Sequence, residues 1–320
     1  MKLPANLDIS DKKSIKQSED RVDLSIFIPT YNEEIHIERS IKSALKIAKE
    51  VFIVDSHSTD KTLEIAKKYD IAIFEGEWHH LGQKLNWAIV NLPIKTQWVM
   101  RLDADEYFTN ELISEIKVKL PNLSNSISAV SFCRRIYFMG KWMKKGTSRT
   151  PIIRIIKKGK AYYENRWLDE HVIVRDGGVI IFKSDLVDDN LNNLTHWINK
   201  HNKYATLEAI ELIDSELGIV ENKDHVSKLD YKNNKKRKMK DLYTHMPLFI
   251  RPFLFFCYRY FFKLSFLEGK EAFIWDFMQC WWYRTLADAK VFEIYKNCGK
   301  DKNLIVDYIK KNYGIDCRNV

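Results

Sequence analysis

The sequence predicts an α/β fold in which strands and helices alternate, followed by a mostly helical region. Short apolar runs recur between residues 24 and 102 with amphipathic segments between them, and polar residues follow three of the four runs. Strands that alternate with helices of this length form parallel βαβ units. From residue 191 onward, apolar residues recur mostly at helical spacing.

Three of the four predicted strands of the first part end in polar side chains. The first strand is stopped by Pro29 and leads into a helix for which we expect Asn32 as the N-cap. The carboxyl ends of parallel strands meet at one edge of a sheet, so the loops should converge on a ligand crevice there. The predicted strands are 24–30, 51–54, 71–74 and 97–102.

The fourth strand ends in Asp103, Ala104, Asp105 and Glu106. Two carboxylates at this place can hold a hard divalent cation, which usually keeps coordination sites free for substrate phosphates. A solvated acidic turn is the alternative, and it is the commoner meaning of an isolated Asp-x-Asp. The surrounding polar loops favour a nucleotide site with Mg²⁺ or Mn²⁺.

Composition limits the class of protein. A chain of 320 residues with 45% hydrophobic residues can bury a large core and suggests about two domains. Its five cysteines form no C-x-x-C pair, which favours reduced thiols in the cytosol. The polar stretch from Met1 to Asp23 predicts that there is no secretory signal.

The net charge of +9 is concentrated in the run from Lys232 to Lys240, directly before an aromatic segment. Basic charge beside aromatic anchors favours an anionic membrane surface over nucleic acid, with a solvated helix face as the alternative. The segment 246–264 is apolar but contains Arg251, Arg259 and Lys263. We therefore expect an interfacial or re-entrant helix with snorkelling bases, and ordinary core packing is the alternative.

Between residues 128 and 182, short β-prone runs alternate with glycine or basic turns, and we expect added strands and acceptor-side loops. Four motifs occur in a consistent order and spacing: 28–34, 54–60, 82–84 and 102–106. With them, the chain resembles the family 2 glycosyltransferases of the GT-A fold, most closely the subgroup that builds bacterial lipopolysaccharide cores and related surface glycans. Residue His57 departs from the glycine that this subgroup usually has.

The resemblance implies a Rossmann-like nucleotide-binding sheet with helices on both faces, plus a C-terminal helical, membrane-facing extension. It implies a lead-in at 1–22, a catalytic domain at 23–190 and a helical region at 191–320. Within the catalytic domain, 23–127 would bind the nucleotide sugar and 128–190 would face the acceptor.

The resemblance also assigns donor-binding roles. Thr30, Tyr31 and Glu33 would contact the base and ribose. Asp55 would accept a hydrogen bond from uracil, with a helix cap on the following turn as the alternative. Lys84 would approach the phosphates as a point charge, or remain a solvated lysine.

For the chemistry, the resemblance implies that Asp105 ligates Mg²⁺ or Mn²⁺ and that Asp103 faces the ribose or the metal. His171 would supply a further metal ligand or a phosphate contact, with a structural role as the alternative. Inversion at the sugar needs a base on the acceptor hydroxyl. Glu170 is the first candidate and Asp169 the second.

The sequence thus predicts an inverting, metal-dependent enzyme that moves a sugar from a UDP-sugar to a lipopolysaccharide core or lipid-linked glycan. It would be cytoplasmic and peripherally bound to the inner face of the cytoplasmic membrane. A metal-dependent nucleotide-sugar phosphohydrolase and a non-catalytic basic membrane-binding protein are the alternatives.

Overall fold

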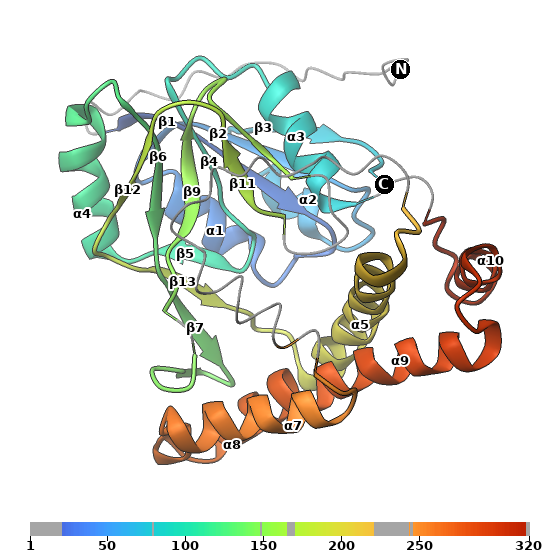
Figure 1. Cartoon of the computed structure of the whole chain (residues 1–320). Helices are drawn as coiled ribbons and strands as arrows, with labels where there is room; N and C mark the ends of the chain where they lie inside the picture. Colours follow the sequence, from blue (N-terminus) through green and yellow to red (C-terminus); the bar gives the residue numbers. More distant parts are fainter. Residues whose placement is uncertain are drawn as a thin grey trace. The chain divides into compact units, whose positions relative to one another are not determined.

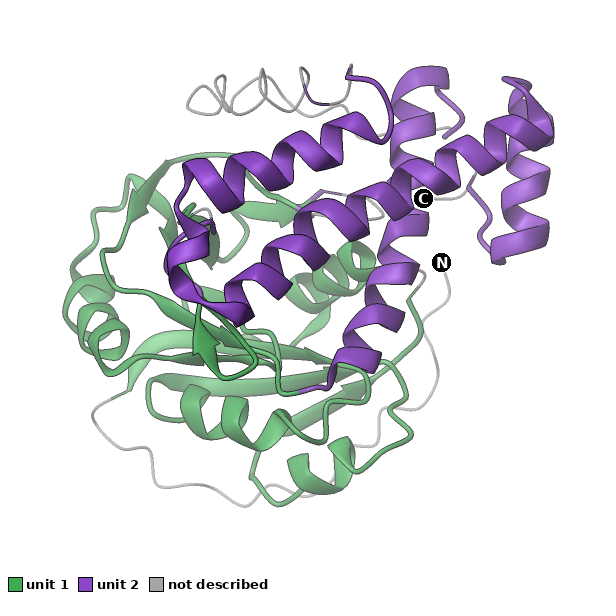
Figure 2. Ribbon diagram, turned by 90° about the horizontal axis from the view of Figure 1, so that it is seen from below, with its two compact units in different colours: residues 1–142, 148–163, 171–191 green, residues 143–147, 164–170, 192–320 purple. Residues whose placement is uncertain are grey.

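The computed structural model describes residues 21–78, 80–147, 149–164, 170–220, 243 and 246–317. The chain divides into two compact units (Figure 2). Unit 1 consists of residues 1–142, 148–163 and 171–191, and unit 2 consists of residues 143–147, 164–170 and 192–320.

Unit 1 is built around a seven-stranded mixed sheet of order β12-β6-β9-β4-β1-β2-β3 (Figure 1). The neighbours β4, β1, β2 and β3 are parallel, whereas β9 is antiparallel to both β4 and β6. The sheet contains β1 (Val22–Thr30), β2 (Ala48–Asp55), β3 (Ala72–Glu75), β4 (Trp98–Arg101), β6 (Ile127–Phe132), β9 (Ile152–Lys157) and β12 (Gly178–Ile181).

Two smaller sheets complete unit 1. A four-stranded sheet has the order β5-β13-β7-β8, and β10 pairs with β11. Their strands are β5 (Glu106–Phe108), β7 (Arg134–Phe138), β8 (Lys141–Trp142), β10 (Ala161–Tyr163), β11 (Val172–Val174) and β13 (Leu186–Asp189).

Alternation along β1 distributes its side chains between two cores. Leu24, Ile26 and Ile28 pack on one face of the sheet with residues of three helices, and Phe27 packs on the other face with a fourth helix. Both faces of β1 are therefore buried, which explains its nearly continuous apolar run. The first three helices are α1 (Ile37–Ala44), α2 (Thr62–Ala66) and α4 (Asn110–Lys119), and the fourth is α3 (Leu81–Asn91).

The predicted α/β GT-A-like fold with C-terminal helices is confirmed, with a mixed rather than a wholly parallel sheet. Unit 2 is largely helical. Within the described residues, no helix is long and apolar enough to cross a membrane. Its helices are α5 (Leu194–Leu217), α7 (Ile250–Cys257), α8 (Lys270–Asp276), α9 (Tyr283–Cys298) and α10 (Lys302–Tyr313), with π-helical segments at Tyr258–Phe262 and Phe277–Trp282.

The expectation that Arg251 and Arg259 snorkel outward is wrong. Arg251 is 3% exposed and forms an ion pair with buried Asp288 of α9. Arg259 donates to the carbonyl of Gly146 (2.5 Å) and pairs with buried Asp276 (3.2 Å). The guanidinium groups turn inward because each finds a buried carboxylate on a neighbouring helix.

The turns that enter and leave the β10–β11 hairpin offer a matched test of local packing. A Cβ added to Gly177 (φ 87°) would lie 2.2 Å from Ser128 Oγ and 2.9 Å from the Ser126 carbonyl oxygen, whereas one added to Gly159 (φ 78°) would meet nothing within 4 Å. We expect Gly159→Ala to cost about 1 kcal/mol for the left-handed backbone, and Gly177→Ala to cost about 3 kcal/mol because a steric clash adds to that strain. Chemical denaturation measures both, and equal losses would contradict the packing described.

Candidate active site

Asp55, at the carboxyl end of β2, is fully buried and directed at its own loop. It accepts hydrogen bonds from Thr30 Oγ1, from the Ser58 backbone N–H and from Ser58 Oγ, each at 2.6 Å. These hydrogen bonds close the turn after β2, but Asp55 does not cap the following helix α2, whose N-cap is Lys61. A uracil contact would have to use a remaining lone pair of this carboxylate.

Lys84 reaches from α3 to the ends of β1 and β2. Its Nζ donates to the Thr30 carbonyl and to Ser56 Oγ, both at 2.8 Å. Burial lowers the pKa of Lys84 to about 8, although the negative charges of Asp55 and Glu33 oppose part of that shift. Lys84 thus ties the two loops together and keeps one N–H donor for a ligand.

The loops after β1 and β2 are held together by further hydrogen bonds. The Asn32 N–H donates to Ser58 Oγ (2.8 Å), Asn32 Oδ1 accepts from the Thr59 N–H (2.8 Å), and the Glu33 N–H donates to Thr62 Oγ1 (2.7 Å). The expectation that Asn32 caps the following helix is wrong, because its side chain is used across the loops and α1 begins only at Ile37.

Both loops contain a residue in the left-handed region. Asn32 has φ 55° and His57 has φ 56°, so His57 adopts the conformation for which the subgroup's glycine is suited. Tyr31, directly before Asn32, is 59% exposed, whereas the Glu33 carboxylate contacts His36 Nδ1 (2.6 Å). Of the predicted base and ribose contacts, Tyr31 is thus the most open to a ligand and Thr30 the least.

Asp103, just past β4, is held by two arginines. Arg101 donates to it through Nε (2.6 Å) and Nη2 (3.1 Å), and Arg154 of β9 donates through Nη2 (3.1 Å). Burial raises the pKa of Asp103, but the two guanidinium groups outweigh burial and hold this pKa well below its usual range. Asp103 is therefore an ionised, already neutralised carboxylate.

Glu106 is buried beside the same arginine. It pairs with Arg154 and accepts the Asp103 backbone N–H (3.1 Å). Burial raises the pKa of Glu106 to about 8, with Arg154 opposing that shift and Asp103 adding to it. Glu106 thus fixes the turn that carries Asp103 and Asp105.

Asp105 differs from its neighbours, because no described basic side chain forms an ion pair with its carboxylate. Asp105 Oδ2 accepts a hydrogen bond from Asn190 Nδ2 (3.0 Å), and Oδ1 accepts none from any described residue. Burial and the charge of Asp105 raise the pKa of nearby Asp188 to about 6. Asp188 itself pairs with Arg134 (2.8 Å), so Asp105 is the carboxylate whose charge no described basic side chain compensates.

Sequence reasoning missed Asp188, which lies in β13, and Asn190, which directly follows that strand. That strand pairs with β5, and the Asp189 N–H donates to the Asp105 carbonyl oxygen (3.0 Å). The segment Leu186–Asn190 begins with two apolar residues and ends in polar ones, as the end of β4 does. This repeated pattern could have indicated these site residues from the sequence.

The family model described as "Glycosyl transferase family 2" matches residues 25–191, which include every loop described above. The chain belongs to glycosyl transferase family 2. The predicted family and enzyme class are confirmed. The two alternatives, a nucleotide-sugar phosphohydrolase and a non-catalytic membrane-binding protein, are therefore wrong.

Curated relatives agree with this assignment. The chain is 26% identical over 209 residues to the lipopolysaccharide core biosynthesis glycosyltransferase LpsC of Rhizobium meliloti, covering 61% of this chain and 73% of that one. It is 28% identical over 202 residues to an uncharacterized glycosyltransferase of Rickettsia typhi (59% and 68%). It is also 41% identical over 95 residues to one of Rickettsia bellii, of which it spans 31%, with 29% of this chain covered.

Solved structures of similar proteins are more distant. Staphylococcus aureus TarS 1–349 in complex with UDP-GlcNAc has a TM-score of 0.43 and 15% identity, covering 91% of this chain and 92% of that one. Mycobacterium tuberculosis glucosyl-3-phosphoglycerate synthase with Mn²⁺, UDP-glucose and phosphoglyceric acid has a TM-score of 0.30 and 22% identity, covering 35% and 44%. At these scores, the assignment of this glycosyltransferase rests on the family model.

The remaining predicted site residues lie in the sequence between β10 and β11. Glu170 belongs to unit 2 and is half-buried, while Asp169 lies outside the described residues. His171 is exposed directly before β11 and makes no hydrogen bond with Asp105. In the described part of the glycosyltransferase, no three His, Cys, Asp or Glu side chains form a metal cluster, so Asp103, Asp105 and His171 do not form one.

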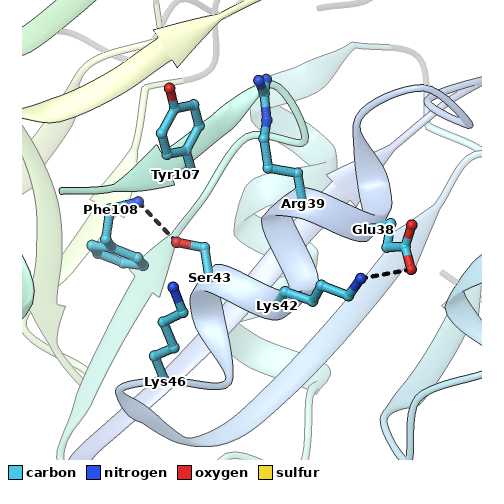
Figure 3. A pocket seen from close by; sticks show the side chains of 7 residues that line it. All are labelled: Glu38, Arg39, Lys42, Ser43, Lys46, Tyr107 and Phe108. Carbon is cyan, nitrogen blue, oxygen red and sulfur yellow. Dashed lines mark hydrogen bonds and ion pairs between the residues drawn. The ribbon is translucent and has the colours of Figure 1, made fainter. Parts of the chain in front are cut away.

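The glycosyltransferase also has a hollow of about 320 Å³ between α1 and β5 (Figure 3). Lys42 pairs there with Glu38 (2.9 Å), and Arg39 lies 4.6 Å from the centre of the Tyr107 ring. Arg39 also pairs with Asp189 (2.7 Å) at the end of β13. None of the predicted site residues lines this hollow, but Arg39 joins it to the strand that supports Asp105.

The burial of Lys84 predicts a dependence of stability on pH. Its pKa is about 8 when folded and 10.5 when unfolded, so between these values the unfolded chain binds more protons and stability rises with pH. Relative to Lys84→Met, the wild-type free energy of unfolding should rise by about 3 kcal/mol from pH 8 to pH 10.5. Urea denaturation across this range measures the difference, and a constant difference would contradict the buried ammonium.

Proposed function

We propose that this protein is an inverting, metal-dependent glycosyltransferase that moves a sugar from a UDP-sugar to a lipopolysaccharide core or a lipid-linked glycan. One observation carries the proposal most directly. At the carboxyl edge of the sheet, Asp103 is neutralised by arginines while Asp105 keeps an oxygen without a described partner, beside Asp188. A divalent cation at Asp105 would compensate this negative charge, and its free coordination sites would take diphosphate oxygens.

The donor set fits Mg²⁺ or Mn²⁺ of the kind found in nucleotide sites. Such ions are usually held by one or two carboxylates, with waters and substrate phosphates completing the coordination. Asp105 would hold the ion, Asn190 would orient the Asp105 carboxylate, and Asp188 would add negative charge nearby. The bound ion would compensate charge on the departing diphosphate.

The loops after β1 and β2 would bind the nucleoside. Tyr31, which is exposed, would lie against the base, while Asp55 and Thr30 would present the rim of the uracil pocket. Lys84 holds this rim in shape and has one N–H left for an anionic oxygen of the ligand. Asp103, fixed by its arginines, would accept a hydrogen bond from the ribose.

Glu170 would remove the proton from the acceptor hydroxyl as that oxygen attacks C1 of the sugar. The bond from C1 to the diphosphate oxygen breaks as the new bond forms, which inverts the anomeric centre. Asp169 is the second candidate for this base. Similarity to the lipopolysaccharide core biosynthesis glycosyltransferase of Rhizobium meliloti supports a lipopolysaccharide core acceptor.

The metal role of Asp105 predicts how UDP binds. Calorimetric titration with UDP should give binding that tightens at least about tenfold with Mn²⁺, and Asp105→Ala should lose this increment. Asp176→Ala is a matched control, because Asp176 is an exposed unit 1 carboxylate that forms an ion pair with Lys160 on the surface. UDP binding that is equal with and without Mn²⁺ would contradict the proposal.

The base assignment predicts a separation of turnover from binding. Glu170→Gln should lower kcat by roughly 10² to 10⁴ while UDP affinity stays unchanged, since the base acts only on the acceptor proton. Glu293→Gln, an exposed change in unit 2, should leave both quantities intact. Full kcat in Glu170→Gln together with a large loss in Asp169→Asn would assign the base to Asp169 instead.

A further inference from the structure

The helix that begins at Ile250 turns its apolar side chains outward. Ile250, Phe253 and Leu254 of α7 are exposed, and Tyr258, Phe261 and Phe262 continue the series through the π-helical segment. These positions recur every three or four residues, so they form one stripe along the helix. Phe262, at its end, is 78% exposed.

The opposite side of the same helix holds the charges. Arg251 pairs with Asp288 of α9, and Arg259 pairs with Asp276 of α8, with both carboxylates buried. A surface helix of a soluble protein normally has the reverse arrangement, with apolar side chains inward and charges outward. This inverted polarity indicates that the exposed stripe contacts an apolar environment when the protein functions. Core packing therefore explains only the buried side of the helix.

A second group of apolar side chains lies at the turn between α7 and α8, which are both orange in Figure 1. Leu264, Phe266 and Leu267 are exposed there, and Phe273 is exposed on α8. We call the exposed apolar residues of 250–273 the apolar face.

Positive charge borders the apolar face. Lys263 and Lys270 flank the turn and are exposed. The Glu268 carboxylate accepts the backbone N–H groups of Lys144 (3.2 Å) and Lys145 (2.8 Å), which places two further exposed lysines beside the turn. The basic run from Lys232 to Lys240, which lies outside the described residues, precedes this segment in the sequence.

We infer that the apolar face is a docking surface for an anionic lipid bilayer, into whose interface the turn with Phe262 and Leu267 inserts. Charge complementarity selects this occupant, because aromatic and aliphatic side chains ringed by lysines match acyl chains below a layer of anionic headgroups. A protein partner or a second copy of the chain would not require the lysine ring to face negative charge. The inference does not rest on the proposed reaction, because lipid binding needs neither donor nor acceptor.

The test is flotation of the full chain with vesicles of phosphatidylcholine alone or with 30% phosphatidylglycerol. This anionic fraction is about that at which the negative surface potential of a membrane attracts polybasic segments. The wild type should float with the anionic vesicles only, and less at high salt because salt screens the lysines. Phe262→Ser with Leu267→Ser should reduce the bound fraction about tenfold, and Lys263→Glu with Lys270→Glu should abolish the preference for anionic vesicles.

Val90→Ser with Leu304→Ser is the matched control, because Val90 is as exposed as Phe262 and Leu304 is nearly as exposed as Leu267, outside the apolar face. This control should float like the wild type. All four substituted apolar side chains are exposed, so melting temperatures should be unchanged and a loss of flotation should report docking alone.

Three results would overturn the inference: no flotation of the wild type, equal flotation on neutral vesicles, or equal losses in the control. A fourth contradicting result would come from light scattering. If the wild type is a dimer and the double variant Phe262→Ser with Leu267→Ser is a monomer, the apolar face binds a second copy of the chain instead. UDP titration distinguishes a failure of this inference from a failure of the proposed function, because the variants of the apolar face should bind UDP normally.

Discussion

The charge balance after β4 is the interaction on which the rest of the site depends. Arg101 and Arg154 neutralise Asp103, and Arg154 also pairs with Glu106, so the turn between these carboxylates is fixed while Asp105 is not neutralised. The antiparallel strand β9 makes this possible, because it brings Arg154 beside β4 from far along the chain. Three neighbouring carboxylates thereby acquire different roles.

Contacts between distant residues also position the other parts of the site in unit 1. The register of β13 with β5 places Asp188 and Asn190 beside Asp105, and Arg39 of α1 holds the end of β13 through Asp189. The loops after β1 and β2 are joined by hydrogen bonds through Asn32 and Lys84. The sheet therefore positions both the loops after β1 and β2 and the acidic turn at one edge.

Much of this could be predicted from local sequence. The four parallel strands and the convergence of their polar ends follow from apolar runs and their spacing, because these are properties of neighbouring residues. The conformation of His57 also follows, since its loop aligns with one that usually has glycine. What the sequence could not predict depends on contacts between distant residues. Examples are the arginines on Asp103, the arrival of β13 at Asp105 and the use of Asn32 across two loops.

Unit 2 gives another example of a feature that local sequence could not predict. An apolar segment interrupted by Arg251 and Arg259 predicts snorkelling when read alone, because the sequence does not reveal Asp288 and Asp276 as partners. Once those ion pairs form, the apolar side chains are left outside. The polarity of the helix is thus set by carboxylates on two other helices and not by its own periodicity.

The central claim is that Asp105 binds the metal while Asp103 is reserved by arginines. Electron paramagnetic resonance of free Mn²⁺, with UDP present, tests this division most directly. We expect the wild type and Asp188→Asn to deplete the free Mn²⁺ signal, and Asp105→Asn to leave it at the level of the protein-free sample. Depletion by Asp105→Asn equal to that of the wild type would contradict the account.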